Sequence, residues 1–180
     1  MELRDQNGLT EKEFIEIYKT KNYPRPYVTT DNVIFANQNG RLFLLLIQRK
    51  GHPFIGRWAL PGGFLNSDET AEEGAARELM EETGVTGASM YSVGVFSKPG
   101  RDPRGWVVTL AYTAVVDMDR TKVAAGDDAG DARWFEVVRT DDTITLQNGD
   151  YTAVIDSTAS DLAFDHGDII RKALEIYDEL

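Results

Sequence analysis

Hydrophobic residues crowd the first third of the chain in two neighbouring stretches. Residues 42–47 read LFLLLI, an unbroken apolar run that is typical of a strand buried on both faces. Residues 27–36, YVTTDNVIFA, form a second strand-like stretch rich in β-branched and aromatic side chains. Asn39 and Gly40 lie between the two and favour a tight turn. The pattern therefore predicts a β-hairpin with a central strand.

Further strands are predicted downstream, where β-branched and aromatic residues gather again. Residues 90–98, 105–117 and 132–138 each have this composition. Residues 142–156 predict another hairpin, with its turn at Asn148-Gly149. Together with the first hairpin, these segments predict a mixed sheet.

Helical periodicity marks both ends of the chain. Residues 9–20 carry Thr10 and Glu13 in the spacing of a capping box, followed by apolar positions at helical intervals. Near the C-terminus a helix is predicted to begin at Ser160 or Asp161. Neither repeats nor low-complexity tracts interrupt the pattern. We therefore expect one α/β domain over residues 27–180, in which helices cover a mixed sheet, and a helical extension over residues 1–26.

A third helix is predicted in the middle of the chain and is strongly acidic. Thr70 and Glu73 form a second capping box, so the helix begins near Ala71, and Gly84 terminates it. Seven acidic residues and one basic residue lie between positions 68 and 82.

Three glutamates of this helix, Glu78, Glu81 and Glu82, lie within about a 100° arc. Like charges at this spacing destabilise a helix by roughly 0.2–0.5 kcal/mol per pair. Carboxylate oxygens are hard ligands that suit Mg²⁺ or Mn²⁺, and a divalent cation would turn the repulsion into coordination. A solvated acidic face is the alternative reading of the same three residues.

The overall charge narrows the range of partners. The chain has 180 residues, no cysteine and a formal net charge of −11. An excess of acid disfavours nucleic-acid binding, which depends on clustered lysine and arginine. No apolar run approaches the roughly 20 residues that cross a bilayer, and the N-terminus lacks the features of a signal peptide. We therefore expect a cytoplasmic protein that binds neither nucleic acid nor a membrane.

The spacing of the acidic segment decides between the two readings of its glutamates. Residues 63–85 fit the pattern G-x5-E-x7-R-E-U-x-E-E-x-G-U, in which U is aliphatic, at every defined position. This pattern resembles the signature of the Nudix hydrolases. The segments WALPGGF, SKPGRDPRGW, DDAGDARWF and LAFDH resemble the ADP-ribose pyrophosphatase branch of that family. The matching positions of the signature are Gly63, Glu69, Arg77, Glu78, Leu79, Glu81, Glu82, Gly84 and Val85.

The resemblance implies a fold and a set of metal ligands. It implies an α/β/α sandwich with a catalytic loop–helix–loop at residues 62–85. Glu78, Glu81, Glu82 and the carbonyl of Gly62 would hold divalent cations, Mg²⁺ or alternatively Mn²⁺. The remaining signature residues Glu69, Arg77 and Gly63 would support this loop and helix, with Glu69 and Arg77 paired to each other.

The resemblance leaves the general base open. Some relatives use a glutamate of the helix, here Glu78, and others use an acid on a later loop. Asp127 and Asp128 are the candidates on that loop. The alternative is that these two aspartates only shape a glycine-rich turn.

Three arginines are candidates for substrate binding. Arg101 and Arg104 lie on a loop rich in proline and glycine, and Arg49 ends the apolar strand. Arginines of this kind would contact phosphate or a terminal ribose. Pro99 lies close to a marker proline of relatives that cleave ADP-ribose. For the remaining candidates, Trp58, Trp106 and His166, structural roles are expected: the tryptophans in the core and the histidine near a helix start.

The resemblance implies hydrolysis of a nucleoside diphosphate linked to another moiety, by water attack on phosphorus. ADP-ribose, giving AMP and ribose 5-phosphate, is the expected substrate. Alternatives are oxidised nucleoside triphosphates, other nucleotide sugars and dinucleoside polyphosphates; the SQPWPFP-like segment of NADH-cleaving relatives is absent. A non-catalytic ADP-ribose sensor is a further alternative. It is disfavoured by the complete signature, by the acidic balance, and by a last helix expected to end at Leu180, which leaves no room for an added DNA-binding domain. Several relatives form homodimers, which makes a homodimer a candidate assembly.

Overall fold

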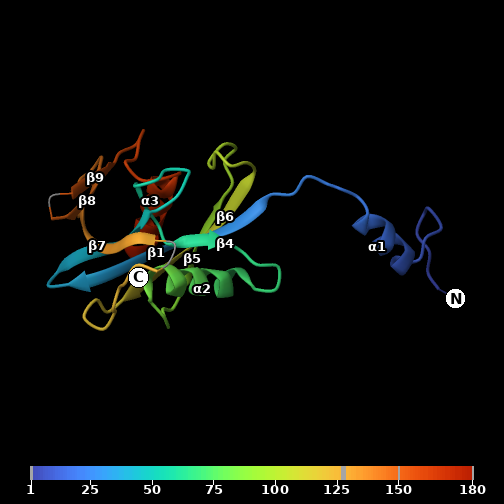
Figure 1. Cartoon of the computed structure of the whole chain (residues 1–180), viewed down its shortest axis with the longest axis horizontal. Coiled ribbons are helices and arrows are strands. Elements are labelled where there is room, and N and C mark those ends of the chain that lie inside the picture. Colours follow the sequence, from blue (N-terminus) through green and yellow to red (C-terminus); the bar gives the residue numbers. More distant parts are fainter. Residues whose placement is uncertain (1, 127–128, 150, 180) are drawn as a thin grey trace.

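A mixed β-sheet forms the centre of the protein in the computed structural model, which describes residues 2–126, 129–149 and 151–179 (Figure 1). Strands follow the order β5-β6-β1-β2-β7-β8-β9, with β3 paired to β2 and β4 paired to β1. β1 and β6 run parallel, whereas the other pairs are antiparallel. The bounds are β1 Tyr27–Gln38, β2 Arg41–Arg49, β3 Trp58–Ala59, β4 Gly62–Phe64, β5 Tyr91–Phe96, β6 Val107–Val116, β7 Ala129–Arg139, β8 Ile144–Asn148 and β9 Tyr151–Ile155.

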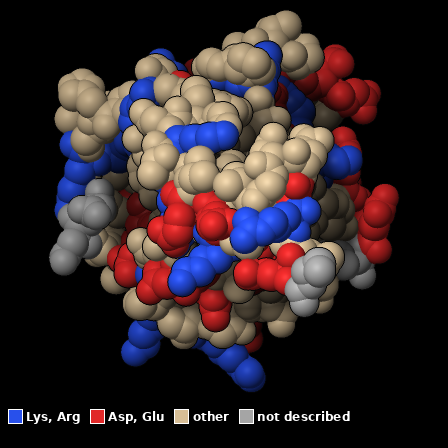
Figure 2. Space-filling view, turned by 90° about the vertical axis from the view of Figure 1, so that its right-hand side faces the viewer, with Lys and Arg blue, Asp and Glu red and all other residues tan. Residues whose placement is uncertain are grey.

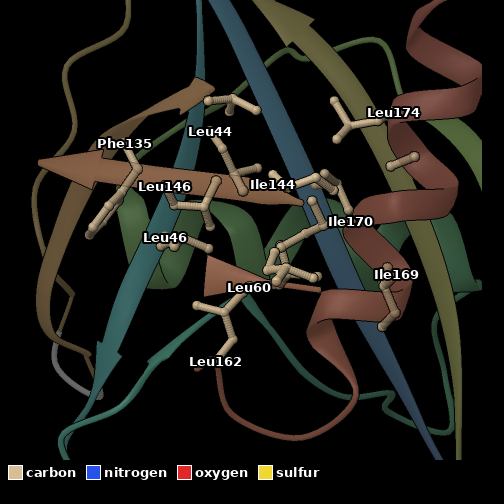
Figure 3. Packing of buried hydrophobic residues seen from close by; sticks show 14 of the residues in the cluster. Leu44, Leu46, Leu60, Phe135, Ile144, Leu146, Leu162, Ile169, Ile170 and Leu174 are labelled. Atoms are coloured by element: carbon tan, nitrogen blue, oxygen red, sulfur yellow. The ribbon is translucent and has the colours of Figure 1, made fainter. Parts of the chain in front are cut away.

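Two helices cover opposite faces of this sheet, which confirms the predicted α/β architecture. α2 (Ala71–Thr83) packs Leu79 against alternate residues of β1 and β2, including Ile34 and Leu45. α3 (His166–Tyr177) packs on the other face, where Figure 3 shows its isoleucines among side chains of β2, β7 and β8. α1 (Glu11–Lys19) buries none of its residues and stands away from the sheet at the end of an extended segment (Figure 1). No helix in the described part of the chain is long and apolar enough to cross a membrane.

Local sequence signals are confirmed at several turns and helix ends. Asn39 and Gly40 adopt positive φ angles of 52° and 76° and connect β1 to β2. β8 and β9 form the second predicted hairpin. Thr10 and Thr70 each make the expected capping box, and Gly84 ends α2 in the left-handed conformation.

Two expectations, one about the start of α3 and one about Trp106, are wrong. α3 begins at His166 rather than at Ser160 or Asp161, because Phe164 takes a left-handed φ of 51° that a continuous helix does not allow. Trp106 is 57% exposed on the loop before β6, whereas the core position expected for Trp58 is confirmed.

Candidate active site

β4 is the element that joins the acidic helix to the rest of the site. A Cβ atom on Gly62 would lie 2.1 Å from the carbonyl oxygen of Thr30 in β1. A Cβ atom on Gly63 would lie 2.5 Å from the carboxylate of Glu78 in α2. The two glycines therefore allow β4 to pass between β1 and the acidic helix at van der Waals distance.

The glutamates of α2 are held by two different donors. Glu82 accepts a hydrogen bond of 2.7 Å from the backbone N–H of Gly62. Glu78 and Glu81 instead share Nη1 of Arg77, at 2.7 Å and 3.0 Å. The predicted pair of Arg77 with Glu69 is present as a bidentate contact of 2.9 Å and 2.6 Å. Arg77 therefore stands at the centre of the acidic cluster, with charge-assisted bonds to three carboxylates.

The expected convergence of the three glutamates on one point is not the arrangement found. Within residues 2–126, 129–149 and 151–179, no three carboxylate or imidazole groups gather as a preformed metal site. Arg77 explains the difference, because its guanidinium draws Glu78 and Glu81 toward itself. The ligand roles of Glu78, Glu81, Glu82 and the Gly62 carbonyl stay predictions.

The electrostatics of the cluster nevertheless fit a divalent cation. Burial raises the pKa of Glu82 to about 8, and the charges of Glu78 and Asp31 add to the rise. Burial also raises the pKa of Glu78, against the opposing effect of Arg77. Glu69 behaves in the opposite way, because its hydrogen bond to Arg77 lowers its pKa to about 2. The carboxylates of Glu78 and Glu82 are thus buried close enough to repel each other. A hard divalent cation that binds carboxylate oxygens would relieve this repulsion.

A cavity of about 90 Å³ opens next to Gly62 and Gly63. It brings together the three arginines that the sequence proposes for substrate binding. Two phenylalanines, a leucine, a histidine, a threonine, two aspartates and two glycines complete its walls. The lining residues are Thr29, Asp31, Arg49, Leu60, Gly62, Gly63, Phe64, Arg101, Asp102, Arg104, Phe164 and His166.

Two of these arginines are neutralised by carboxylates of the protein. Arg101 is 4% exposed and donates two hydrogen bonds, of 2.8 Å and 2.7 Å, to Asp165. Arg104 donates to Asp102 at 2.7 Å from Nη2 and at 3.0 Å from Nε. Arg101 is thus buried and not a solvated loop arginine, and its pair fixes residues 97–106 to the start of α3.

Arg49 differs from both because it forms no ion pair with a carboxylate among the described residues. Its Nε donates to the carbonyl of Pro53 at 2.7 Å, and its guanidinium lies 4.9 Å from the ring centre of Phe164. Burial lowers the pKa of Arg49, and the charge of Arg104 lowers it further. A negative group entering the cavity would relieve this repulsion, so Arg49 is the cation best placed to meet an anion.

Replacing Arg101 by alanine is expected to destabilise the fold by about 3–5 kcal/mol, because Asp165 would be left as a buried charge without its partner. Arg139→Ala is the matched control, since the Arg139–Asp178 pair is 40% and 50% exposed and such surface pairs contribute about 0–1 kcal/mol. Urea unfolding monitored by circular dichroism measures both values. Equal losses in the two variants would contradict the structural role of Arg101.

The loop that carries the alternative bases approaches the acidic helix at its C-terminal end. The N–H groups of Ala124 and Gly126 donate to the carbonyls of Thr83 and Glu82, each at 3.0 Å. Asp127 and Asp128 themselves lie outside the described residues. Their role as bases stays a prediction.

Sequence reasoning missed several residues of the site, among them three that lie next to one another. Asp31 and Asp165 were not considered, and His166 was assigned only a structural role. In the structure, Oδ1 of Asp31 lies 3.4 Å from Nε2 of His166, and its Oδ2 lies 3.6 Å from Nη2 of Arg101. Asp165 forms an ion pair with the same arginine. The only signal for Asp31 was a carboxylate inside an otherwise strand-like stretch.

On the face shown in Figure 2, acidic and basic side chains are interspersed and no continuous basic surface forms. The cationic groups described above instead point into the cavity. Phosphate-backbone binding depends on a basic surface of the kind that this face lacks.

Known proteins match most of the chain. The NUDIX domain family model matches residues 26–154. An ADP-ribose pyrophosphatase of Methanocaldococcus jannaschii is 35% identical over 156 residues, which cover 87% of this chain and 78% of that protein. The ADPR responsive transcriptional repressor NtrR of Acinetobacter baylyi is 34% identical over 93% of this chain, but the match spans only 60% of the repressor.

Solved structures give the same result in three dimensions. A MutT/nudix family protein from Enterococcus faecalis superposes with a TM-score of 0.85 at 40% identity, over 95% of this chain and 70% of that one. The NUDIX domain of Shewanella oneidensis NrtR, solved with ADP ribose, superposes with a TM-score of 0.75 at 31% identity, over 94% and 99%. With the acidic helix, the diglycine strand and the arginine-lined cavity, these matches show that the chain belongs to the Nudix family.

Proposed function

We propose that this protein hydrolyses ADP-ribose to AMP and ribose 5-phosphate in a reaction that depends on Mg²⁺ or Mn²⁺. The observation that supports the proposal is that the acidic face of α2 and the arginine-lined cavity meet at Gly62 and Gly63. Glu78 and Glu82 approach these glycines from α2, and the arginine-lined cavity opens beside them. A diphosphate at this junction would contact both the divalent metal held by the glutamates and the arginines of the cavity.

The carboxylates of Glu78, Glu81 and Glu82 and the carbonyl of Gly62 would hold the metal. When bound, the metal supplies charge neutralisation at the diphosphate and lowers the pKa of a coordinated water. Glu69 keeps Arg77 in place beside these carboxylates through its bidentate contact. Glu78, Asp127 and Asp128 are the candidates that would take the proton from the attacking water.

The names of the relatives favour ADP-ribose as the substrate. The relative from M. jannaschii is named an ADP-ribose pyrophosphatase, and the Shewanella structure contains ADP ribose. A non-catalytic sensor is the second candidate, because the Acinetobacter relative is named an ADPR responsive repressor. Turnover separates the two candidates, since both would bind ADP-ribose and only the hydrolase would consume it.

Arg49→Ala is expected to lower kcat/KM for ADP-ribose by about 10- to 150-fold, the loss of one hydrogen bond to a charged group. We choose Arg49 for this test because Arg101 and Arg104 are already paired with Asp165 and Asp102 and are less available to a substrate phosphate. Steady-state kinetics at saturating Mg²⁺ measure the effect, with Arg139→Ala as a control remote from the cavity. Wild-type kcat/KM in the Arg49 variant would remove this residue from the substrate site.

A comparison of substrates tests the choice of ADP-ribose. We expect kcat/KM for ADP-ribose to exceed the values for 8-oxo-dGTP, NADH and a dinucleoside polyphosphate. A competitor that is tenfold better, about 1.4 kcal/mol of transition-state preference, would overturn ADP-ribose and leave metal-dependent hydrolysis standing.

A further inference from the structure

A buried polar cluster around Asp31 lines the cavity, and its residues are not among the metal ligands proposed above. The side chain of Asp31 on β1 is only 10% exposed, and it lies between His166 and Arg101. Both neighbours are themselves buried, with side chains that are 5% and 4% exposed. A charged carboxylate at such a depth needs partners, because burial without them is costly.

The orientation of His166 is fixed by the backbone. The N–H of Leu60 donates to Nδ1 of His166 at 2.8 Å, so Nδ1 is the unprotonated nitrogen. Burial lowers the pKa of the imidazole and keeps it neutral. Its one ring proton is therefore on Nε2, which faces Oδ1 of Asp31 at 3.4 Å.

Neither neighbour satisfies the carboxylate of Asp31. The contacts of 3.4 Å to His166 and 3.6 Å to Arg101 exceed the roughly 2.7–3.2 Å of a protein hydrogen bond. Arg101 is also committed to Asp165 through two short bonds. The side chain of Asp31 accepts no hydrogen bond from the described residues, and it lines the cavity. Asp31 thus presents acceptor oxygens to whatever enters.

An ionised carboxylate selects the chemistry of its ligand. It accepts hydrogen bonds and donates none, so it attracts hydroxyl groups and repels phosphate. At about 90 Å³, the cavity is well below the roughly 300–1,000 Å³ of whole-ligand pockets, so it holds only a part of the substrate. The guanidinium of Arg104 lies 4.9 Å and 5.5 Å from the ring centres of Phe64 and Phe164 and covers the apolar walls. A hydroxylated sugar fits these walls better than a purine base.

We propose that Asp31 accepts hydrogen bonds from the vicinal hydroxyls of the terminal ribose and so selects a sugar at that end of the diphosphate. The inference rests on the proposed function and adds to it a specificity residue. His166 and Arg101 lie on either side of Asp31. A third phosphate in the same place would be repelled by the carboxylate.

The first test uses the wild-type protein and measures binding by calorimetry in EDTA, where the substrate is not consumed. ADP-ribose is compared with an analogue that lacks the 2- and 3-hydroxyls of the terminal ribose. We expect the analogue to bind about 10- to 100-fold more weakly, the range for hydrogen bonds to a charged group. An analogue that lacks the 2-hydroxyl of the adenosine ribose should bind like ADP-ribose. Loss of affinity for the adenosine analogue alone would overturn the proposal.

The second test repeats the comparison with Asp31→Asn, which keeps the shape and removes the charge. The discrimination against the terminal-ribose analogue should fall to about threefold or less. Glu136→Gln, which changes a carboxylate paired with Arg41 outside the cavity, should keep the full discrimination. Retained discrimination in Asp31→Asn, or none in the wild type, would overturn the role of Asp31 while ADP-ribose binding still supports the proposed function. Failure of the wild type either to bind or to hydrolyse ADP-ribose in the presence of Mg²⁺ would overturn both.

Discussion

Glu82→Gln is expected to lower kcat by more than the roughly 10- to 100-fold that follows when a residue supporting a metal ligand is lost. The substitution preserves the size of the side chain and removes the charge that lies against Gly62. A metal ion bound beside Gly62 would then lose the carboxylate of Glu82 as an anionic ligand, at the place where the diphosphate is expected to contact α2. Steady-state kinetics over a range of Mg²⁺ concentrations measure kcat and the metal requirement together. Turnover at the wild-type rate would show that Glu82 is not a ligand.

The stability of the same variant provides the control for folding. Burial raises the pKa of Glu82 to about 8, from an ordinary value of 4.5. The folded, metal-free protein therefore binds a proton that the unfolded chain has released, and its stability falls as the pH rises from about 4.5 to 8. Glu82→Gln does not titrate, so its Tm in EDTA should match or exceed that of the wild type at pH 8. A large drop in Tm would mean that the kinetic loss reflects unfolding.

Removal of divalent metal is expected to have the largest effect of all. EDTA should abolish hydrolysis, because Arg77, which lies beside the glutamates of α2, is committed to Glu69, Glu78 and Glu81 and cannot replace the metal. Excess Mg²⁺ should restore the full rate, and Mn²⁺ is expected to substitute for it. The rate of AMP release in chelator measures the effect. Undiminished turnover in EDTA would contradict the metal assignment.

Local signals in the sequence predicted the local structure well. The ends of α2 followed from Thr70, Glu73 and Gly84, because capping and left-handed termination involve residues only a few positions apart. The turn at Asn39-Gly40 followed for the same reason. The start of α3 could not be predicted, since the helical pattern of its apolar residues continues back through Phe164, whose left-handed φ depends on its tertiary contacts.

The contacts of the site residues were the part that sequence could not supply. Arg101 reaches Asp165 across 64 positions, and His166 meets the backbone of Leu60 across 106. These contacts exist because the start of α3 lies beside both the loop before β6 and the segment between β3 and β4. The Glu69–Arg77 pair was predictable, but the further contacts of Arg77 with Glu78 and Glu81 were not, because its flexible side chain chooses among several carboxylates.

The junction at Gly62 and Gly63 is expected to bring a diphosphate between the carboxylates of α2 and the arginine-lined cavity. The most direct test of this claim is to incubate the purified protein with ADP-ribose and Mg²⁺ and to separate the products by anion-exchange chromatography. We predict AMP and ribose 5-phosphate in equal amounts, with neither product formed in EDTA. Bound ADP-ribose that remains intact after prolonged incubation with Mg²⁺ or Mn²⁺ would contradict the claim and favour the sensor.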